Sequence, residues 1–384
     1  MKRVFLIVLD SFGIGTAPDS ADFGDAGADT LASVRRSAKF SAENMKKLGL
    51  FNIDGIEGGI PAPTGAYARM TERSRGKDTI IGHWEMCGVI SERPMPTFPH
   101  GFPDELLDRL SAAWGRGILC NKPYSGTQVI ADYGREHVES GKLIVYTSAD
   151  SVLQIAAHED VVPIEELYRD CELARGICQG KYGVGRIIAR PFEGDFPYRR
   201  TARRHDFALV PPHKTTLDLL KDAGLDVIAV GKINDIFAGH GVTDAIKTAG
   251  NADGMEKTMA LLARDFHGFA FVNLVDFDMV YGHRRDIDGY AAAIAAFDKW
   301  LGTFLQKMRP DDLLLITGDH GCDPGFTGTD HTREYTPLVA AGAAVRPGSL
   351  GTRHSFADIG ATVADIFGVK NPNAGDSMKE ALLG

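Results

Sequence analysis

Three short apolar runs each end in a turn that carries an aspartate, and this pattern limits the fold more than any other. The runs are residues 4–9, 269–275 and 313–317, and their length and β-forming composition predict buried strands. Stretches with helical periodicity, such as residues 251–266 and 290–308, separate them. This alternation predicts an α/β fold with a mostly parallel sheet flanked by helices. Ligands bind at the carboxyl ends of the strands in such a sheet.

The length of the chain predicts two domains, because 384 residues exceed what one hydrophobic core usually serves. The pattern changes between residues 93 and 210, where prolines cluster first and arginines gather near the end. We predict that residues 93–210 form an inserted α+β cap domain that binds substrate, and that residues 1–92 and 211–384 form a metal-binding catalytic core. A solvated basic surface is the alternative explanation for the arginines.

Charge and cysteine content exclude several classes of protein. A formal net charge of -9 argues against a general nucleic-acid or membrane-surface partner, since both require a basic face. The apolar run at residues 4–9 is too short for a secretion signal, and no run is long enough to span a bilayer. Five cysteines without C-x-x-C spacing predict a reducing, cytoplasmic location.

Carboxylates and imidazoles follow the three predicted strands and predict a metal centre. The six candidate ligands are Asp10, Asp278, His283, Asp319, His320 and His331. Six ligands serve two divalent ions at about three each, and such a pair stabilises both oxygens of a phosphoryl displacement. Mixed oxygen and nitrogen ligands favour manganese, with zinc or iron as alternatives. The alternative is that Asp319 caps the next segment and that His320 is an ordinary loop histidine.

Thr79 is the candidate nucleophile. Asp78 or Thr79 is placed to cap a helix that begins here, and a helix N-terminus favours an incoming phosphate. An alcohol needs coordination or a base before it attacks, which requires the metal centre beside it. Two alternatives stay open: Thr79 is only a cap, or Ser11 is the nucleophile. For Ser11, hydrogen bonding within its loop is the favoured role.

The motifs together resemble the alkaline phosphatase superfamily and, within it, the phosphopentomutase family, over nearly the whole chain. The resemblance rests on Asp10, KDTIIGHWE at residues 77–85, Asp278 to His283, GDHG at residues 318–321, and His331. Three segments of the predicted cap, at residues 121–134, 146–159 and 183–192, carry the narrower resemblance. The chain departs from the family's T-x-T-G-H-W-E pattern at Ile81, which removes a hydroxyl close to Thr79.

The resemblance implies a complete activity. Asp278, His283 and His331 would hold one Mn²⁺ ion, and Asp10, Asp319 and His320 would hold the other. Thr79 would bridge the ions as a phosphothreonine. The enzyme would be an isomerase that interconverts ribose 1-phosphate and ribose 5-phosphate, and the deoxyribose phosphates, through a pentose 1,5-bisphosphate, in nucleoside and pentose phosphate catabolism. A sugar bisphosphate such as glucose 1,6-bisphosphate would act as activator.

Five further residues are candidates for contacts with the pentose phosphate. Ser148 and Asp150 match the family's sugar-contacting positions, and guanidinium groups at Arg186 and Arg204 suit the distal phosphate. Lys232 is a further phosphate candidate. Cap closure would exclude water while the bisphosphate reorients.

Other functions remain open at this stage. A metal-dependent phosphohydrolase, a mutase of the phosphoglycerate type and a non-catalytic sugar-phosphate binding protein are all compatible with the metal ligands. Cys322 lies beside those ligands in the sequence, and we assign it to packing because six harder ligands are already present.

Overall fold

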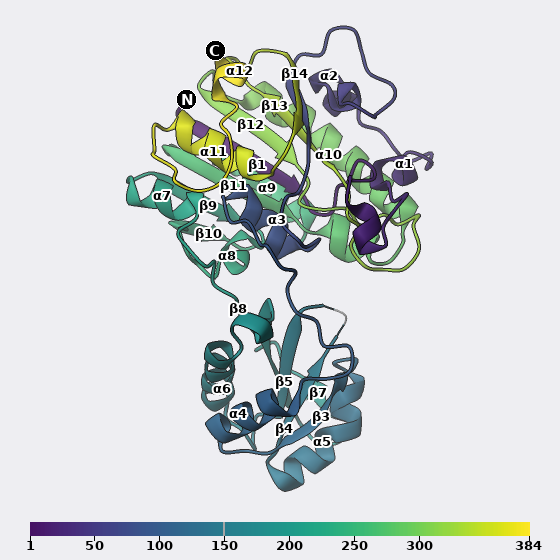
Figure 1. Ribbon diagram of the computed structural model, residues 1–384, viewed down its shortest axis with the longest axis vertical. Coiled ribbons are helices and arrows are strands. Elements are labelled where there is room, and N and C mark those ends of the chain that lie inside the picture. Colours follow the sequence, from purple (N-terminus) through teal and green to yellow (C-terminus); the bar gives the residue numbers. More distant parts are fainter. Residues whose placement is uncertain (149) are drawn as a thin grey trace. The chain divides into compact units, whose positions relative to one another are not determined.

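The computed structural model describes residues 1–148 and 150–384, which divide into two compact units (Figure 1). Unit 1 comprises Met1–Pro94 and Pro211–Gly384, and unit 2 comprises Met95–Val210. Each unit contains its own sheet, and hydrophobic clusters pack against it. None of the helices in the described ranges has the length and apolar character needed to cross a membrane.

An eight-stranded sheet forms the centre of unit 1. Its order is β10-β9-β11-β1-β12-β13-β2-β14. The strands are β1 (Arg3–Leu9), β2 (Ala66–Met70), β9 (Asp226–Val230), β10 (Asp244–Ile246), β11 (Gly268–Leu274), β12 (Asp312–Thr317), β13 (Thr336–Ala341) and β14 (Gly348–Arg353). Only β13 runs antiparallel to its neighbours, β12 and β2, so the prediction of a mostly parallel sheet flanked by helices is confirmed.

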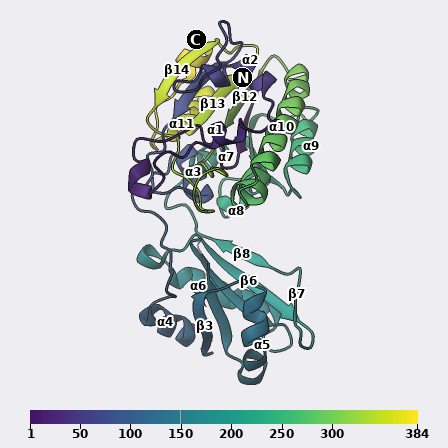
Figure 2. The ribbon, with the colours of Figure 1, turned by 90° about the vertical axis from the view of Figure 1, so that its right-hand side faces the viewer.

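Helices cover both faces of this sheet. One face carries α1 (Thr30–Val34), α2 (Glu43–Leu48), α9 (Asn251–Leu261) and α10 (Ile287–Lys307); the other carries α3 (Thr79–Met86), α7 (Thr216–Asp222), α8 (Ile233–Ile236), α11 (Ala357–Ile366) and α12 (Lys379–Leu383). Short helical turns are η1 (Ser20–Phe23), η2 (Leu50–Asn52) and η4 (Phe277–Gly282). Figure 2 shows α9 and α10 together on one side of the sheet. Because both faces are covered, β1 is buried along its whole length, as its continuous apolar sequence predicts.

Element ends differ from prediction where long-range contacts decide them. The helix predicted near residues 31–40 ends at Val34, after which the chain turns and places Phe40 against Phe51. The helix predicted over residues 251–266 ends at Leu261. Phe266 then packs edge-on against Phe5 of β1, at 5.7 Å between ring centroids. In both cases an aromatic contact follows the earlier helix end, and the contact of Phe266 joins distant parts of the chain.

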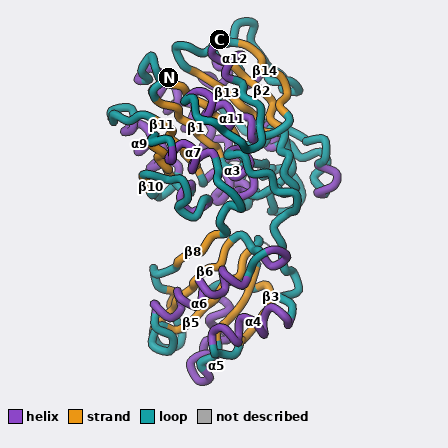
Figure 3. Tube along the Cα trace, turned by 60° about the vertical axis from the view of Figure 1, so that its left-hand side comes forward, coloured by secondary structure: helices purple, strands orange, loops and turns teal. Residues whose placement is uncertain are grey.

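Unit 2 is a three-layer α+β structure with a six-stranded sheet. Its strands are β3 (Ile118–Pro123), β4 (Leu143–Thr147), β5 (Val152–His158), β6 (Arg186–Glu193), β7 (Arg199–Arg200) and β8 (His205–Ala208). Its helices are α4 (Asp104–Trp114), α5 (Gln128–Ser140), α6 (Ile164–Ile177) and the turn η3 (Gly180–Tyr182). Helices α4 and α6 contact each other, and α5 packs against β3, β4 and β5 with a separate apolar cluster (Figure 3).

His137 of α5 makes the stability of unit 2 dependent on pH. The ring is fully buried; Nδ1 bonds to the Lys142 carbonyl at 2.6 Å and Nε2 accepts from the His158 amide at 2.8 Å. Only the neutral ring makes both bonds, and burial lowers the pKa of His137. The unfolded chain takes up a proton near pH 6.5 and the folded chain does not. This stabilisation is therefore complete above about pH 6.5 and is lost as pH falls below it.

We expect His137→Gln to lower the free energy of unfolding by about 1–3 kcal/mol at pH 8, because it disturbs two buried hydrogen bonds. The loss of stability between pH 7 and pH 5 should also become smaller. Urea unfolding at both pH values, followed by intrinsic fluorescence, measures this. His100→Gln, at an exposed histidine of unit 2, is the matched control. An unchanged pH dependence in His137→Gln would contradict the assignment.

Candidate metal centre

Three adjacent strands bring the predicted ligands to one edge of the unit 1 sheet. Strand β1 lies between β11 and β12, with Leu9 level with Leu274 and Val8 level with Thr317. Asp10 follows β1 directly, and Asp319 follows β12. After β11 the chain forms the π-helix η4, which carries Asp278 and ends before His283.

Asp10, Asp319 and His320 form the first group, and all three are buried. His320 Nε2 lies 3.6 Å from Asp10 Oδ1 and 3.3 Å from Asp319 Oδ2. Its Nδ1 bonds to the Gly321 carbonyl at 3.0 Å, which leaves Nε2 without a proton and free to act as a ligand. The Ser11 amide donates to the other oxygen of Asp319 at 2.8 Å. These contacts orient the three side chains so that their potential metal-ligand atoms lie close together.

Asp278 joins the second group. Its Oδ2 lies 3.2 Å from His283 Nε2, and its Oδ1 lies 3.4 Å from His331 Nε2. The other nitrogen of His283 bonds to the Thr329 carbonyl at 2.6 Å. His320 is also near, with its ring 4.2 Å from that of His331, so Asp278, His320 and His331 form a further possible ligand set. The six predicted ligands therefore meet in one cluster.

The residues present fit divalent ions. Asp278 Oδ1, Asp319 Oδ2 and His331 Nε2 are buried and lack a hydrogen-bond partner among the described residues. Burial, together with the carboxylates of Asp319 and Asp278, raises the pKa of Asp10, and the charge of Lys232 opposes this. Bound cations would both satisfy these atoms and relieve the repulsion between carboxylates.

Cys322 lies beside the cluster. Its sulfur is 3.9 Å from His283 Nδ1, the nitrogen that also bonds to Thr329, and 3.6 Å from the Asp330 carbonyl. The ligand atoms of Asp278, His283 and Cys322 lie within 4.8 Å of one another. Because the sulfur approaches the nitrogen that already has a partner, packing remains the simpler role for Cys322.

Thr79 is the first residue of α3, and its hydroxyl faces the first group of ligands. Its Oγ1 lies 3.5 Å from Asp10 Oδ1 and 3.3 Å from His320 Nε2. Asp78 caps the helix by accepting from the Ile80 and Ile81 amides, so the Thr79 hydroxyl is not used for capping. The Ser11 hydroxyl instead lies 3.3 Å from the Tyr290 hydroxyl. Of the two nucleophile candidates, Thr79 is the one whose hydroxyl contacts predicted metal ligands.

The candidate substrate residues are divided between the two units. Lys232 is in unit 1, at the start of α8. Ser148 and Asp150 follow β4 in unit 2, where Asp150 Oδ2 lies 3.7 Å from Arg186 Nη2. Arg204 makes a bidentate contact with Asp206 at 2.7 Å for both bonds, and Arg186 lies 3.6 Å from the same carboxylate. Both predicted arginines thus already have an acidic neighbour.

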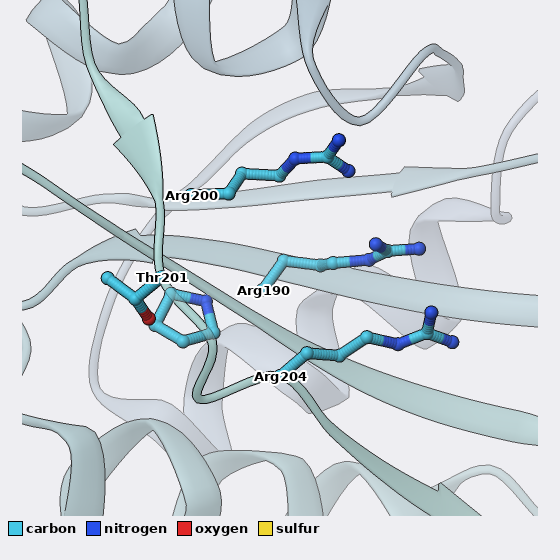
Figure 4. Close-up of a pocket in the computed structure, with 5 residues that line it drawn as sticks. Arg190, Arg200, Thr201 and Arg204 are labelled. Atoms are coloured by element: carbon cyan, nitrogen blue, oxygen red, sulfur yellow. The ribbon is translucent and has the colours of Figure 1, made fainter. Parts of the chain in front are cut away.

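Three arginines line a pocket of about 130 Å³ in unit 2, and of these only Arg204 is predicted from the sequence to bind phosphate. Arg190, Arg200 and Arg204 extend their guanidinium groups side by side, and Pro191 and Thr201 complete the lining (Figure 4). The Tyr146 hydroxyl is buried and has no partner within the described ranges. Burial raises the pKa of Tyr146, and the same three arginines oppose that shift. The pocket therefore offers concentrated positive charge to an anion.

Arg333 connects two segments close to the metal centre, although the sequence predicts no role for it. Its buried guanidinium donates to the carbonyls of Glu72 and Gly76, at 2.6 Å each, and contacts the Glu72 carboxylate. It also pairs with Asp19 at 2.9 Å. Arg333 thereby connects the segment that leads to Thr79 with the loop that carries His331. No periodicity or spacing in the sequence indicates these contacts.

Metal binding should stabilise the fold. If the cluster binds Mn²⁺, the metal at 100 times its Kd should add about 2.7 kcal/mol to the free energy of unfolding for each site. Urea unfolding with Mn²⁺, with EDTA, and with EDTA followed by excess Mn²⁺ measures this. The expected order is stable, destabilised and restored. An unfolding midpoint that is the same in all three conditions would contradict a metal centre here.

Comparison with known proteins agrees with the fold. The chain matches the model of the Metalloenzyme superfamily over residues 2–371. The PH0037 protein of Pyrococcus horikoshii has the same fold, with a TM-score of 0.53 at 15% identity and coverage of 97% of this chain and 99% of that one. Fold and match define an alkaline-phosphatase-like metalloenzyme.

Similarity to individual proteins is much closer. The chain is 59% identical to the phosphopentomutase of Lachnoclostridium phytofermentans over 100% of both chains. It is 53% identical to that of Carboxydothermus hydrogenoformans over 98% of both. The chain therefore belongs to the phosphopentomutase family, and it is an enzyme of the isomerase class.

Proposed function

We propose that this isomerase interconverts ribose 1-phosphate and ribose 5-phosphate, and the corresponding deoxyribose phosphates, through a phosphothreonine at Thr79. The observation that carries the proposal is the position of the Thr79 hydroxyl, at the N-terminus of α3 and within 3.5 Å of Asp10 and 3.3 Å of His320. Family membership supplies the class of reaction.

The reaction begins with phosphorylated Thr79. A free hydroxyl of the pentose monophosphate attacks phosphorus, and the bond from phosphorus to Thr79 Oγ breaks. The proton of the attacking hydroxyl is transferred to Thr79 Oγ, which restores the threonine hydroxyl. The product is the pentose 1,5-bisphosphate. After it reorients, Thr79 attacks the other phosphate and gives its proton to the sugar oxygen that leaves. Each cycle regenerates the phosphothreonine.

Asp10, Asp319 and His320 would hold one divalent ion, and Asp278, His283 and His331 the other. The ions supply positive charge that stabilises the attacking and leaving oxygens. We propose Mn²⁺, because mixed carboxylate and imidazole ligands suit it. The N-terminus of α3 adds backbone amides and the positive end of a helix dipole beside the transferred phosphate.

We propose that unit 2 is the substrate-binding cap. Ser148 and Asp150 would contact the sugar, and Lys232 of unit 1 would contact a phosphate. Arg186 and Arg204 would bind the distal phosphate. We extend this set to Arg190 and Arg200, which line the same pocket as Arg204. Each guanidinium group can donate two parallel hydrogen bonds to the oxygens of a phosphate.

A sugar bisphosphate such as glucose 1,6-bisphosphate would phosphorylate Thr79 initially, and the pathway would be nucleoside and pentose phosphate catabolism. We propose a cytoplasmic location. The five cysteines are all free thiols, which suits a reducing compartment.

A paired assay tests the function. Purified protein with Mn²⁺ and a trace of glucose 1,6-bisphosphate receives ribose 1-phosphate, and both ribose 5-phosphate and free phosphate are followed in the same tube. The proposal expects isomerisation without release of phosphate, and loss of turnover when a chelator is added. Phosphate release without isomerisation would identify a phosphohydrolase and overturn the proposal. Binding of ribose phosphate without turnover would indicate a binding protein.

A further inference from the structure

Two buried polar residues outside the predicted ligand set lie against Asp10 and Asp319. Asn273 of β11 has 1% of its surface exposed, and His83 of α3 has none. Asn273 Nδ2 donates to Asp10 Oδ2 at 2.8 Å and lies 3.3 Å from His83 Nε2. Because Asp10 Oδ2 is used in this way, Asp10 Oδ1 is the oxygen that faces His320 and Thr79.

The hydrogen bonds define how the imidazole of His83 is oriented. His83 Nδ1 bonds to the Thr79 carbonyl at 2.8 Å, and a carbonyl only accepts, so Nδ1 carries the proton. His83 Nε2 is then the acceptor for the Asn273 amide. The same Nδ1 also lies 3.2 Å from Asp319 Oδ2, a close contact and not a hydrogen bond, and the ring stacks on Phe271 with 5.5 Å between ring centroids. Both ring nitrogens therefore have hydrogen-bond partners, and the ring is fully buried.

A continuous set of contacts thus connects Asp10, Asn273, His83 and Asp319, and also reaches the backbone of Thr79. We propose that Asn273 and His83 are positioning residues that hold the two carboxylates for one divalent ion and keep them in register with the helix that carries the nucleophile. The inference depends on the metal centre proposed above. Replacing a group that orients metal ligands in this way typically lowers metal affinity by roughly 10- to 100-fold.

The contacts also explain why a carboxamide is used at position 273. A carboxylate there would repel Asp10, and an apolar side chain would leave Asp10 Oδ2 buried without a donor. The amide group supplies one hydrogen to Asp10 and one to His83 without adding charge. The side-chain oxygen of Asn273 has no partner within the described ranges, so the hydrogen bonds of its amide nitrogen orient the side chain.

Mn²⁺ titration of the metal-free protein tests the proposal. Free Mn²⁺ is followed by its electron paramagnetic resonance signal, and bound Mn²⁺ by the spectrum of a coupled pair. The wild-type protein should bind two ions. Asn273→Leu should bind one ion with unchanged affinity and the second about 10 to 100 times more weakly. A general loss of structure would weaken both sites, so selective loss identifies a positioning role.

Two further variants complete the design. His83→Asn keeps a donor near the position of Nδ1 and removes the acceptor at Nε2, so it should weaken the same metal site. This variant keeps the proposal testable if Asn273→Leu does not fold. Asn44→Leu removes a comparable contact, from Asn44 Nδ2 to the Asp298 carbonyl at 2.8 Å, and should leave both sites intact. Equal affinities in wild type, Asn273→Leu and His83→Asn would overturn the inference. A wild-type protein that binds no pair of ions would instead overturn the metal centre itself.

Discussion

Replacement of Thr79 by alanine should lower kcat for isomerisation by about 10⁴-fold or more, which is the scale seen when a catalytic nucleophile is removed. The hydroxyl is the group that accepts and returns the phosphoryl group, and its neighbours at 3.3–3.5 Å cannot replace it as a nucleophile in this geometry. Helix α3 should persist, because Asp78 provides its cap. Mn²⁺ binding should also remain, since alanine removes none of the six ligands.

Phosphoenzyme formation separates this explanation from a loss of structure. Wild-type protein incubated with radiolabelled glucose 1,6-bisphosphate should retain the label after denaturation, and Thr79→Ala should not. Thr79→Ser keeps the hydroxyl and is the matched control; it should retain label and part of the turnover. Full turnover in Thr79→Ala would show that the nucleophile assignment is wrong, and Ser11 would then be tested by the same labelling.

The second large effect is expected at Arg333. Arg333→Met should lower the free energy of unfolding by about 3–5 kcal/mol, the usual result when one partner of a buried ion pair is removed. The side chains of Arg333 and Glu72 are only 1% and 2% exposed, and two backbone carbonyls also depend on the guanidinium. Urea unfolding at pH 7.5 measures the change. Activity should fall as well, because the segment before Thr79 loses its connection to the His331 loop.

Glu72 provides the control for this prediction. Burial raises the pKa of Glu72, and Arg333 is the main group that opposes the shift. Without Arg333, the Glu72 carboxylate binds a proton more tightly in the folded state than in the unfolded state. The deficit should therefore be largest above the raised pKa and should shrink as pH falls through it. Arg333→Met combined with Glu72→Gln should recover part of the loss at pH 7.5. Additive effects of the two substitutions would contradict the coupling.

Local sequence patterns determine much of this protein. Continuous apolar runs form strands because their side chains are covered on both faces of the sheet, and β1, β11 and β12 lie where those runs predict. An aspartate at the end of each run is carried to the same edge, since parallel strands end together. Asp10, Asp278 and Asp319 meet for that reason, and the histidines that follow them in the chain come with them.

Tertiary structure alone decides which atoms contact which. Nothing within the sequence around Asn273 indicates that its amide reaches Asp10 and His83, or that Arg333 contacts Glu72, because these partners are 190 to 263 residues apart. The grouping of Arg190, Arg200 and Arg204 around one pocket likewise depends on how β6 pairs with β7 and β8. Periodicity specifies the face on which a side chain lies, whereas its hydrogen-bond partner depends on the packing of distant segments, which no local pattern encodes.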